Sequence, residues 1–234
     1  MFQKRKGIQM PRTIRSLSRD EALVKKRREY IANTAFKLFL KKGFHATTMR
    51  EISRACKLAT GTIYNYIGSK SDILGIMCLV AVENERMRLQ PVLEKVNTSS
   101  ATEALQDGIR VLFKKYHECQ DWLTFVNRQM FLFPGEYRRM LLSAQVDTEE
   151  VFKNILTKGV ETGEFQVEPS MVNLISVSIL GMANEWVTRS WHLRSQFTLE
   201  EYTEKYIEAI LKQIRVDREP LGLELMATRL KGGN

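Results

Sequence analysis

The side chains most often used for catalysis or metal binding are few in this sequence and widely spaced. The three histidines, His45, His117 and His192, have no nucleophile or carboxylate at a spacing typical of an active site. The segment His-Glu-Cys at 117–119 lacks zinc-ligand spacing. The cysteines are scattered and odd in number, which favours reduced, mostly buried thiols over a disulfide framework: Cys56, Cys78 and Cys119. We therefore expect neither an enzyme nor a bound metal or cofactor.

The chemistry that the sequence favours is electrostatic. Residues 1–75 contain 17 Lys and Arg against 5 Asp and Glu, whereas the remainder contains 19 against 22. All of the net charge of +9 therefore comes from the first third of the chain. A basic segment joined to a slightly acidic body is typical of a protein that binds a polyanion with one end. A basic run such as KKRR at 25–28 could equally be a solvated helix face.

Length and hydropathy limit the class of protein. A chain of 234 residues can form one large or two small domains, each with its own core. No apolar run approaches the roughly 18 residues of a membrane-spanning helix. The basic N-terminal segment lacks the apolar stretch and cleavage site of a secretory signal. We expect a cytoplasmic protein with no membrane partner.

Helical periodicity organises the basic third. It predicts a helix over residues 18–42, with a capping box at Ser18–Glu21 and a stop at Gly43. A second capping box, Thr48–Glu51, opens a helix of about two turns. We expect Thr60 to cap a third, also short, helix.

A further capping box at Ser69–Asp72 opens a longer helix that runs towards Pro91. The two short helices before it cannot bury much surface alone. Packed steeply against the first helix, they would form a helix-turn-helix that presents the second short helix to a DNA major groove.

The sequence resembles the TetR (tetracycline-repressor) family of bacterial transcription regulators over about residues 28–74. The shared pattern comprises Ile-x-x-x-Ala-x-x-Leu-Phe, a Gly-Phe pair, a Thr-Thr pair, Gly-Thr-Ile-Tyr and a Ser-Lys. It departs at the turn, where Lys57-Leu58-Ala59 replaces the family's glycine and serine, and at Ile67, where the family has phenylalanine. Lys57 must then tolerate a left-handed backbone or the turn must have another geometry.

The resemblance implies a role in DNA binding for residues of both short helices. The matching family positions of one set contact bases or the adjoining sugar-phosphate: Thr60, Thr62, Asn65 and Tyr66. Arg50 matches a position that can reach a guanine edge. Three positions are implied as phosphate contacts: Thr48, Tyr64 and Lys70. For Tyr64, a core aromatic is an equally good interpretation.

The rest of the chain is predicted to be helical throughout. Apolar positions recur with a helical period over 104–116, 122–133, 137–162, 167–193 and 198–214, and strand alternation is absent from the sequence. We therefore expect an all-α protein in four segments: a basic flexible arm (1–17), a helix-turn-helix DNA-binding domain (18–68), a helical ligand-binding and dimerisation domain (69–215) and a C-terminal tail (216–234). The arm could follow the DNA backbone or enter the minor groove.

Residues 171–191 are apolar almost all round, which predicts a partner on both faces of this helix. In the TetR family the last two long helices pair with their copies as a four-helix bundle. The resemblance implies a homodimer that binds the two half-sites of a palindromic operator. The predicted interface residues are Leu174, Val177, Ser178, Gly181, Ile207, Ile210 and Leu211. The alternative is a helix buried within one subunit.

Aromatic and polar side chains of the middle helices predict a pocket for a small-molecule effector. The candidate lining residues are Phe113, Trp122, Phe125, Asn127, Arg128, Phe131, Phe152, Asn184 and Trp186. The segment GMANEWVTRSWHLRSQFTLEEY is loosely similar to the C-terminal pattern of family members that respond to acyl-CoA esters. An acyl-CoA or long-chain amphiphile is therefore favoured over a cationic drug.

The resemblance implies a ligand-responsive, sequence-specific transcriptional regulator of bacterial type. We expect a homodimeric repressor that dissociates from a palindromic double-stranded DNA operator when its ligand binds. Two variants of this hypothesis stay open: an activator, and a regulator that binds its operator only with the ligand bound. A different class of protein is the alternative: a nonspecific architectural DNA-binding protein. Basic residues alone give salt-dependent DNA binding without sequence specificity.

Overall fold

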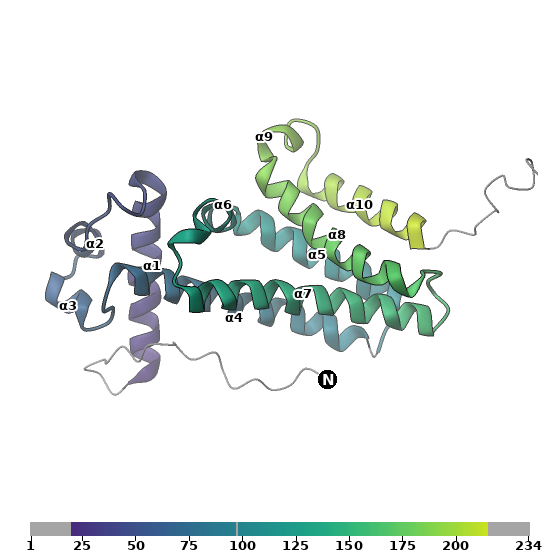
Figure 1. Cartoon of the computed structure of the whole chain (residues 1–234), viewed down its shortest axis with the longest axis horizontal. Helices are drawn as coiled ribbons and strands as arrows, with labels where there is room; N and C mark the ends of the chain where they lie inside the picture. The colour runs from purple at the N-terminus through teal and green to yellow at the C-terminus, as the bar shows by residue number, and fades with distance from the viewer. Residues whose placement is uncertain (1–19, 97, 215–234) are drawn as a thin grey trace, which may run out of the picture.

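The computed structural model describes residues 20–96 and 98–214, and these form an all-helical protein without strands (Figure 1). The arm at 1–17, the box residue Ser18 and the tail at 216–234 lie outside the described residues. The elements are α1 (Glu21–Lys42), α2 (Met49–Cys56), α3 (Thr60–Tyr64), α4 (Lys70–Val96), α5 (Ala101–Glu118), α6 (Gln120–Gln129), the 3₁₀ helix η1 (Met130–Leu132), α7 (Gly135–Glu161), α8 (Pro169–Thr188), α9 (Ser190–Leu193) and α10 (Leu199–Ile214).

The helices form a head and a body (Figure 1). Helices α1 to α3 make up the head at one end, and α1 crosses the direction of the long body helices. Helix α4 leaves the head and runs beside α5 and α7, and α8 packs on α5 and α7 while α10 packs on α5. The long helix predicted from Ser69 is therefore the element that spans head and body.

The ends of α1 follow from its sequence. The Asp20 carboxylate accepts a hydrogen bond from the Leu23 N–H at 3.1 Å, so Asp20 caps the helix, two residues after the predicted cap at Ser18. Gly43 ends it with a φ of 86°, and its N–H donates to the Phe39 carbonyl at 2.8 Å. The predicted stop at Gly43 is confirmed.

The head has its own hydrophobic core, here called the head core. Its buried members from the head and from α4 include Ile31, Ala35, Phe39, Ile52, Ile63, Ile67, Ile73 and Leu74. Members from much later in the chain complete it: Phe125, Val126, Phe133 and Tyr137. The head core thus extends beyond residue 68 in the sequence, because α6 and the start of α7 pack against the head.

The remaining buried side chains form a second cluster, here called the body core. It contains residues of α5, α7, α8 and α10 together with the second half of α4. Leu89 and Val92 of α4 belong to it, whereas Ile73 and Leu74 belong to the head core. One continuous helix is therefore anchored in both cores.

Helices α4 and α7 approach closely at Gly75. A β-carbon on Gly75 would lie 2.1 Å from Cζ of Tyr137, a ring that is almost completely buried. Real β-carbons do not come this close to a neighbour, so only glycine lets the Tyr137 ring pack against α4 at this point.

Within the described residues, every helix is too short or too polar to cross a bilayer.

Gly75→Ala should lower the free energy of unfolding by about 1–3 kcal/mol, the usual cost of overpacking a core. Urea denaturation followed by circular dichroism measures this change. Gly61→Ala is the matched control, because a β-carbon there meets no atom within 4 Å; its effect should stay within about 1 kcal/mol. Equal stability of the Gly75 variant and wild type would contradict the close packing.

Candidate nucleic-acid interface

The start of α2 is fixed by reciprocal hydrogen bonds. The Thr48 hydroxyl accepts from the Glu51 N–H at 3.2 Å, and the Glu51 carboxylate accepts from the Thr48 N–H at 2.9 Å. This confirms the predicted capping box. The carboxylate also pairs with the Lys42 ammonium. The Lys42 ammonium, together with the N–H and hydroxyl of Thr48, lowers the pKa of Glu51 to about 2.

The turn between α2 and α3 uses a left-handed residue. Lys57 has φ 54° and ψ 40°, so the left-handed backbone considered for it is confirmed. The Leu58 N–H donates to the Ser53 carbonyl at 3.0 Å, which closes the turn. Lysine supplies here the conformation for which the family usually has glycine.

The predicted cap of α3 is wrong. Ala59 is the N-cap residue, and it makes no side-chain capping bond. Thr60 is already the first residue of the helix, and its hydroxyl lies 3.0 Å from the Ser53 hydroxyl. Thr60 therefore joins α3 to α2 instead of capping α3.

The side chains of the α3 region divide into an inner and an outer set. Ile63 and Ile67 are fully buried in the head core. Tyr64 is 48% exposed, so the structure does not place it as the core aromatic that the sequence left open. Asn65 is also exposed, and Thr62 and Tyr66 are both partly exposed. Asn65 and Tyr66 lie just after the end of α3 and not within it.

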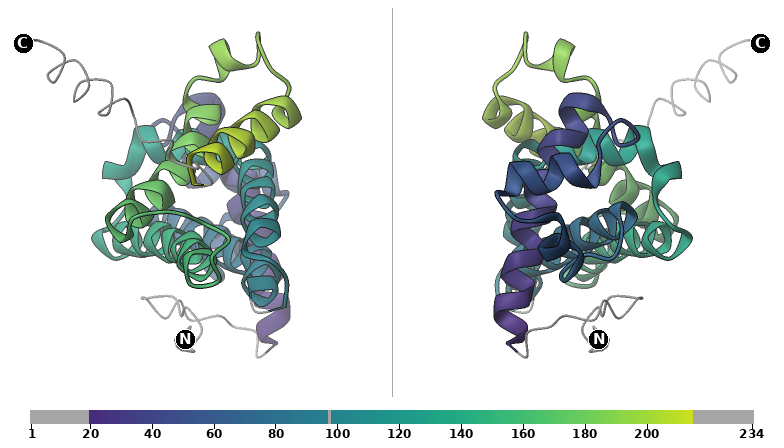
Figure 2. Two further views of the ribbon diagram at one scale, coloured as in Figure 1. Left: turned by 90° about the vertical axis from the view of Figure 1, so that its right-hand side faces the viewer. Right: turned by 90° about the vertical axis from the view of Figure 1, so that its left-hand side faces the viewer.

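Arg50 projects from the first turn of α2, and its side chain is exposed. Viewed end-on, α2 and α3 lie together on the outer side of the head, away from the body (Figure 2, right). The outer side of the head therefore carries both short helices, with Arg50 on α2 and Tyr64 on α3.

Two residues that sequence reasoning missed hold α2 and α3 on α1. The Arg28 guanidinium donates to the Tyr66 carbonyl at 3.0 Å, and the Tyr30 hydroxyl donates to the Cys56 carbonyl at 3.3 Å. Cys56 is the last residue of α2, and Tyr66 follows α3 by two residues. Arg28 belongs to the run KKRR, so its contact could not be separated from a solvated charge by composition alone.

Lys70, implied as a phosphate contact, has other partners. Its ammonium donates to the carbonyls of Phe44 at 2.7 Å, His45 at 3.2 Å and Thr47 at 2.9 Å. It also lies 4.5 Å from the centroid of the Phe44 ring. Burial lowers the pKa of Lys70.

Two protein-family models match the chain. The model of bacterial regulatory proteins of the tetR family covers residues 31–75, which include α2, α3 and the turn between them. The model of the tetracyclin repressor-like C-terminal domain covers residues 98–214, half of the chain.

The chain belongs to the TetR family.

It is therefore a DNA-binding transcriptional regulator and not an enzyme. The chain is 24% identical to the HTH-type transcriptional regulator HbdR of Aromatoleum sp. (strain CIB) over 193 residues, 82% of each protein. It shares its fold with TetR-family regulators of known structure. PfmR from Thermus thermophilus aligns with a TM-score of 0.66 and 26% identity, over 78% of this chain and 97% of that one. FadR from Bacillus subtilis, solved in complex with stearoyl-CoA, aligns with a TM-score of 0.62 and 22% identity, over 80% and 99%.

The residues predicted to line an effector pocket in this TetR-family body do not gather at one place. Phe113, Phe152 and Trp186 are fully buried in the body core. Trp122 and Phe125 instead pack against Phe36 of α1, at centroid distances of 5.8 and 5.5 Å. They lie where α6 of the body packs against α1 of the head.

The other predicted pocket residues lie nearer the surface. Phe131 is 69% exposed, and Arg128 is also exposed. Asn127 and Asn184 bind each other, with an amide nitrogen to oxygen distance of 2.9 Å, and this bond joins α6 to α8. Each amide thus has a protein partner of its own.

Two polar arrangements of the body bring in residues that the sequence did not suggest for a pocket, one of them beside the predicted Trp186. Near the end of α8, Trp186 Nε1 donates to His117 Nδ1 at 3.1 Å, and Arg194 lies 5.4 Å from the Trp186 ring centroid. Farther along the body, the Lys115 ammonium pairs with the Glu85 carboxylate at 2.6 Å, and both side chains are largely buried. These partners come from different helices, so their spacing in the sequence carried no signal.

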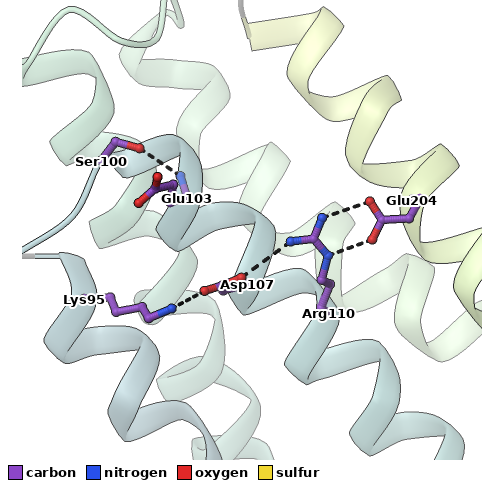
Figure 3. A network of polar contacts seen from close by, with 6 residues as sticks. All are labelled: Lys95, Ser100, Glu103, Asp107, Arg110 and Glu204. Carbon is purple, nitrogen blue, oxygen red and sulfur yellow. Dashed lines mark hydrogen bonds and ion pairs between the residues drawn. The ribbon is translucent and has the colours of Figure 1, made fainter.

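Helix α10 is attached to its own subunit by charge as well as by packing. The Arg110 guanidinium of α5 binds both carboxylate oxygens of Glu204 of α10, at 2.7 and 2.9 Å (Figure 3). Asp107 of α5 also contacts Arg110 and pairs with Lys95 of α4. Helices α4, α5 and α10 are thereby linked along one side of the body.

The predicted interface residues of the TetR-type dimer divide by helix. On α8, Leu174 is 59% and Val177 50% exposed. Gly181 is also exposed, and a β-carbon there would meet nothing within 4 Å. The Ser178 hydroxyl donates to the Ile175 carbonyl at 2.8 Å and lies 3.3 Å from the Tyr206 hydroxyl of α10.

On α10, Ile207 and Ile210 are buried in the body core of the same subunit, and Leu211 is half-buried against it. The outward face of this helix carries Glu200, Glu201, Glu204, Lys205, Glu208 and Lys212. The apolar surface open to a partner is therefore on α8 rather than on α10.

Proposed function

We propose that this regulator is a homodimeric, cytoplasmic repressor that binds a palindromic operator through α2 and α3 and leaves it when an effector binds the body. The observation that carries the proposal is the division of side chains in the head. Ile63 and Ile67 are completely buried, while Arg50, Tyr64 and Asn65 remain open to solvent. Such an arrangement suits a helix whose outer face enters a major groove.

Contact chemistry supports base reading by this surface. A guanidinium at Arg50 can bond two acceptors of a guanine, and the Asn65 amide can pair with an adenine edge. Thr60, Thr62 and Tyr66 are proposed to contact bases or sugar-phosphate beside them, and Thr48 and Tyr64 to bind phosphates.

The dimer is proposed to form on the outer face of α8. Leu174, Val177 and Gly181 are spaced three and four residues apart, so they share one face of the helix. A glycine there lets the partner helix approach closely. A two-fold dimer would place its two heads on half-sites about 34–36 Å apart.

The effector is proposed to be a small apolar molecule, with an acyl-CoA or long-chain amphiphile as the first choice. Support comes from the aromatic body core around Phe113, Phe152 and Trp186 and from the fold shared with FadR, which was solved with stearoyl-CoA bound. Because α4 is anchored in both cores, a shift of its body half would alter the position of the head.

Arg50→Ala should reduce the specificity of the protein for its preferred DNA sequence. The probe is a palindromic duplex selected by the wild-type protein from a random-sequence library, compared with a scrambled duplex of equal length. We expect affinity for the selected duplex to fall by about 1–3 kcal/mol and affinity for the scrambled duplex to change little. The charge-matched control is Arg86→Ala, on an exposed site of α4 in the body. Equal losses on both duplexes would favour an architectural protein without base reading.

Val177→Glu should convert the dimer to a monomer, because a carboxylate would be buried in the proposed interface. Analytical ultracentrifugation measures the mass of the particle. Met87→Glu is the matched control, since Met87 is a similarly exposed apolar residue, on α4. The control should remain a dimer. A monomeric wild-type protein would refute the two-fold model.

Acyl-CoA esters should stabilise the protein and release it from the selected duplex. Native mass spectrometry of the purified protein detects a bound ligand. Thermal-shift titration with acyl-CoAs, free fatty acids and aromatic cations then identifies the chemical class of the effector. A ligand present at about a hundredfold excess over its Kd should add about 2.7 kcal/mol to the free energy of unfolding. Stabilisation by aromatic cations alone would refute the acyl-CoA assignment and leave DNA binding untouched.

A further inference from the structure

The Lys70 ammonium joins two segments of the head that are far apart in the sequence. Lys70 is the first residue of α4, and its three acceptors, the carbonyls of Phe44, His45 and Thr47, lie in the loop between α1 and α2. A lysine ammonium has three N–H donors. The number of carbonyl acceptors equals the number of donors.

The position is unusual for a lysine. A positive charge at the N-terminus of a helix is opposed by the helix dipole. The three carbonyls and the Phe44 ring, 4.5 Å away, surround the charge with negative partial charges that offset this repulsion. The loop carbonyls also have a partner in the ammonium, which a shorter or neutral side chain would remove.

The loop that Lys70 holds leads directly into α2. Thr47 is completely buried, and the next residue, Thr48, forms the capping box that begins α2. The opposite end of the reading surface is held by Arg28, which donates to the Tyr66 carbonyl after α3. The two contacts lie at the two ends of the α2–α3 unit.

We propose that Lys70 is a positioning residue for operator recognition: it fixes the α1–α2 loop to the start of α4, and so sets where α2 begins, instead of binding a phosphate. This inference rests on the proposed role of α2 and α3 in reading the operator. It makes the start of α4 and the start of α2 move together when α4 shifts.

A phosphate contact and a positioning role respond differently to arginine. Lys70→Arg keeps the positive charge, which is what a phosphate requires. A planar guanidinium on a longer side chain cannot direct three N–H groups from one atom to three carbonyls. Lys70→Arg therefore keeps the positive charge but loses the three hydrogen bonds from one nitrogen. Lys70→Met removes the charge but retains most of the aliphatic chain.

Salt dependence gives a second distinction. Each phosphate contact contributes about 0.9 to the slope of log affinity against log salt concentration. Loss of one contact in each subunit of a dimer would lower the slope by about 1.8. Loss of a positioning residue weakens binding to the preferred sequence while leaving the slope nearly unchanged.

The test compares wild type, Lys70→Arg and Lys70→Met on the duplex selected by wild type and on its scrambled counterpart, from about 50 to 200 mM KCl. We expect both variants to bind the selected duplex about tenfold or more weakly, with unchanged slopes and nearly unchanged binding to the scrambled duplex. Wild-type affinity in Lys70→Arg, together with a slope reduced by about 1.8 in Lys70→Met, would show a phosphate contact and overturn the proposal.

Hydrogen exchange of the DNA-free proteins tests the contact independently of any operator. Peptides covering residues 44–52 should exchange faster in both variants than in wild type, while peptides from α8 should be unchanged. Unchanged exchange at 44–52 would overturn the proposal even if DNA binding fell. If wild type selected no duplex, the proposed function would fail, and the exchange data would still decide whether Lys70 holds the loop.

Discussion

The surface of α2 and α3 that is proposed to read DNA depends on the burial of Ile63 and Ile67. Helix α3 has five residues, far fewer than an isolated helix needs to persist in water, and it has no side-chain cap. It is therefore held by packing on its inner side and by the contacts at its two ends. Because the inner side is fully used by the head core, the outer side is free for a partner.

The same core joins the head to the body. Phe125, Phe133 and Tyr137 from α6, α7 and the segment between them pack in it together with residues of α1 to α4. The body thus contacts the head along two routes, through α4 and through α6 with the start of α7. The Asn127–Asn184 bond links α6 to α8, which carries the proposed dimer face. The proposed dimer face, the body and the head are in this way connected by packed helices.

The sequence predicted those features that are determined locally. The stop at Gly43, the Thr48–Glu51 box and the all-helical body follow from capping chemistry and from the helical period. The cap of α3 was mispredicted because Thr60 had a nearer partner in Ser53. Trp122 and Phe125 pack against α1, and Ile207 is buried in the core of its own subunit. These positions depend on contacts between distant segments, which the helical period of the sequence does not predict.

The three tryptophans occupy three different environments, and this gives the protein an internal optical probe. Trp186 is buried and hydrogen-bonded to His117, whereas Trp191 on α9 is 78% exposed. Trp122 packs edge-on against Phe36, at the contact between α6 and α1. Indole emission is sensitive to solvent and to neighbouring groups, so a rearrangement at this contact would change the emission of Trp122. Movement between body and head can thus be followed by intrinsic tryptophan fluorescence, without any attached dye.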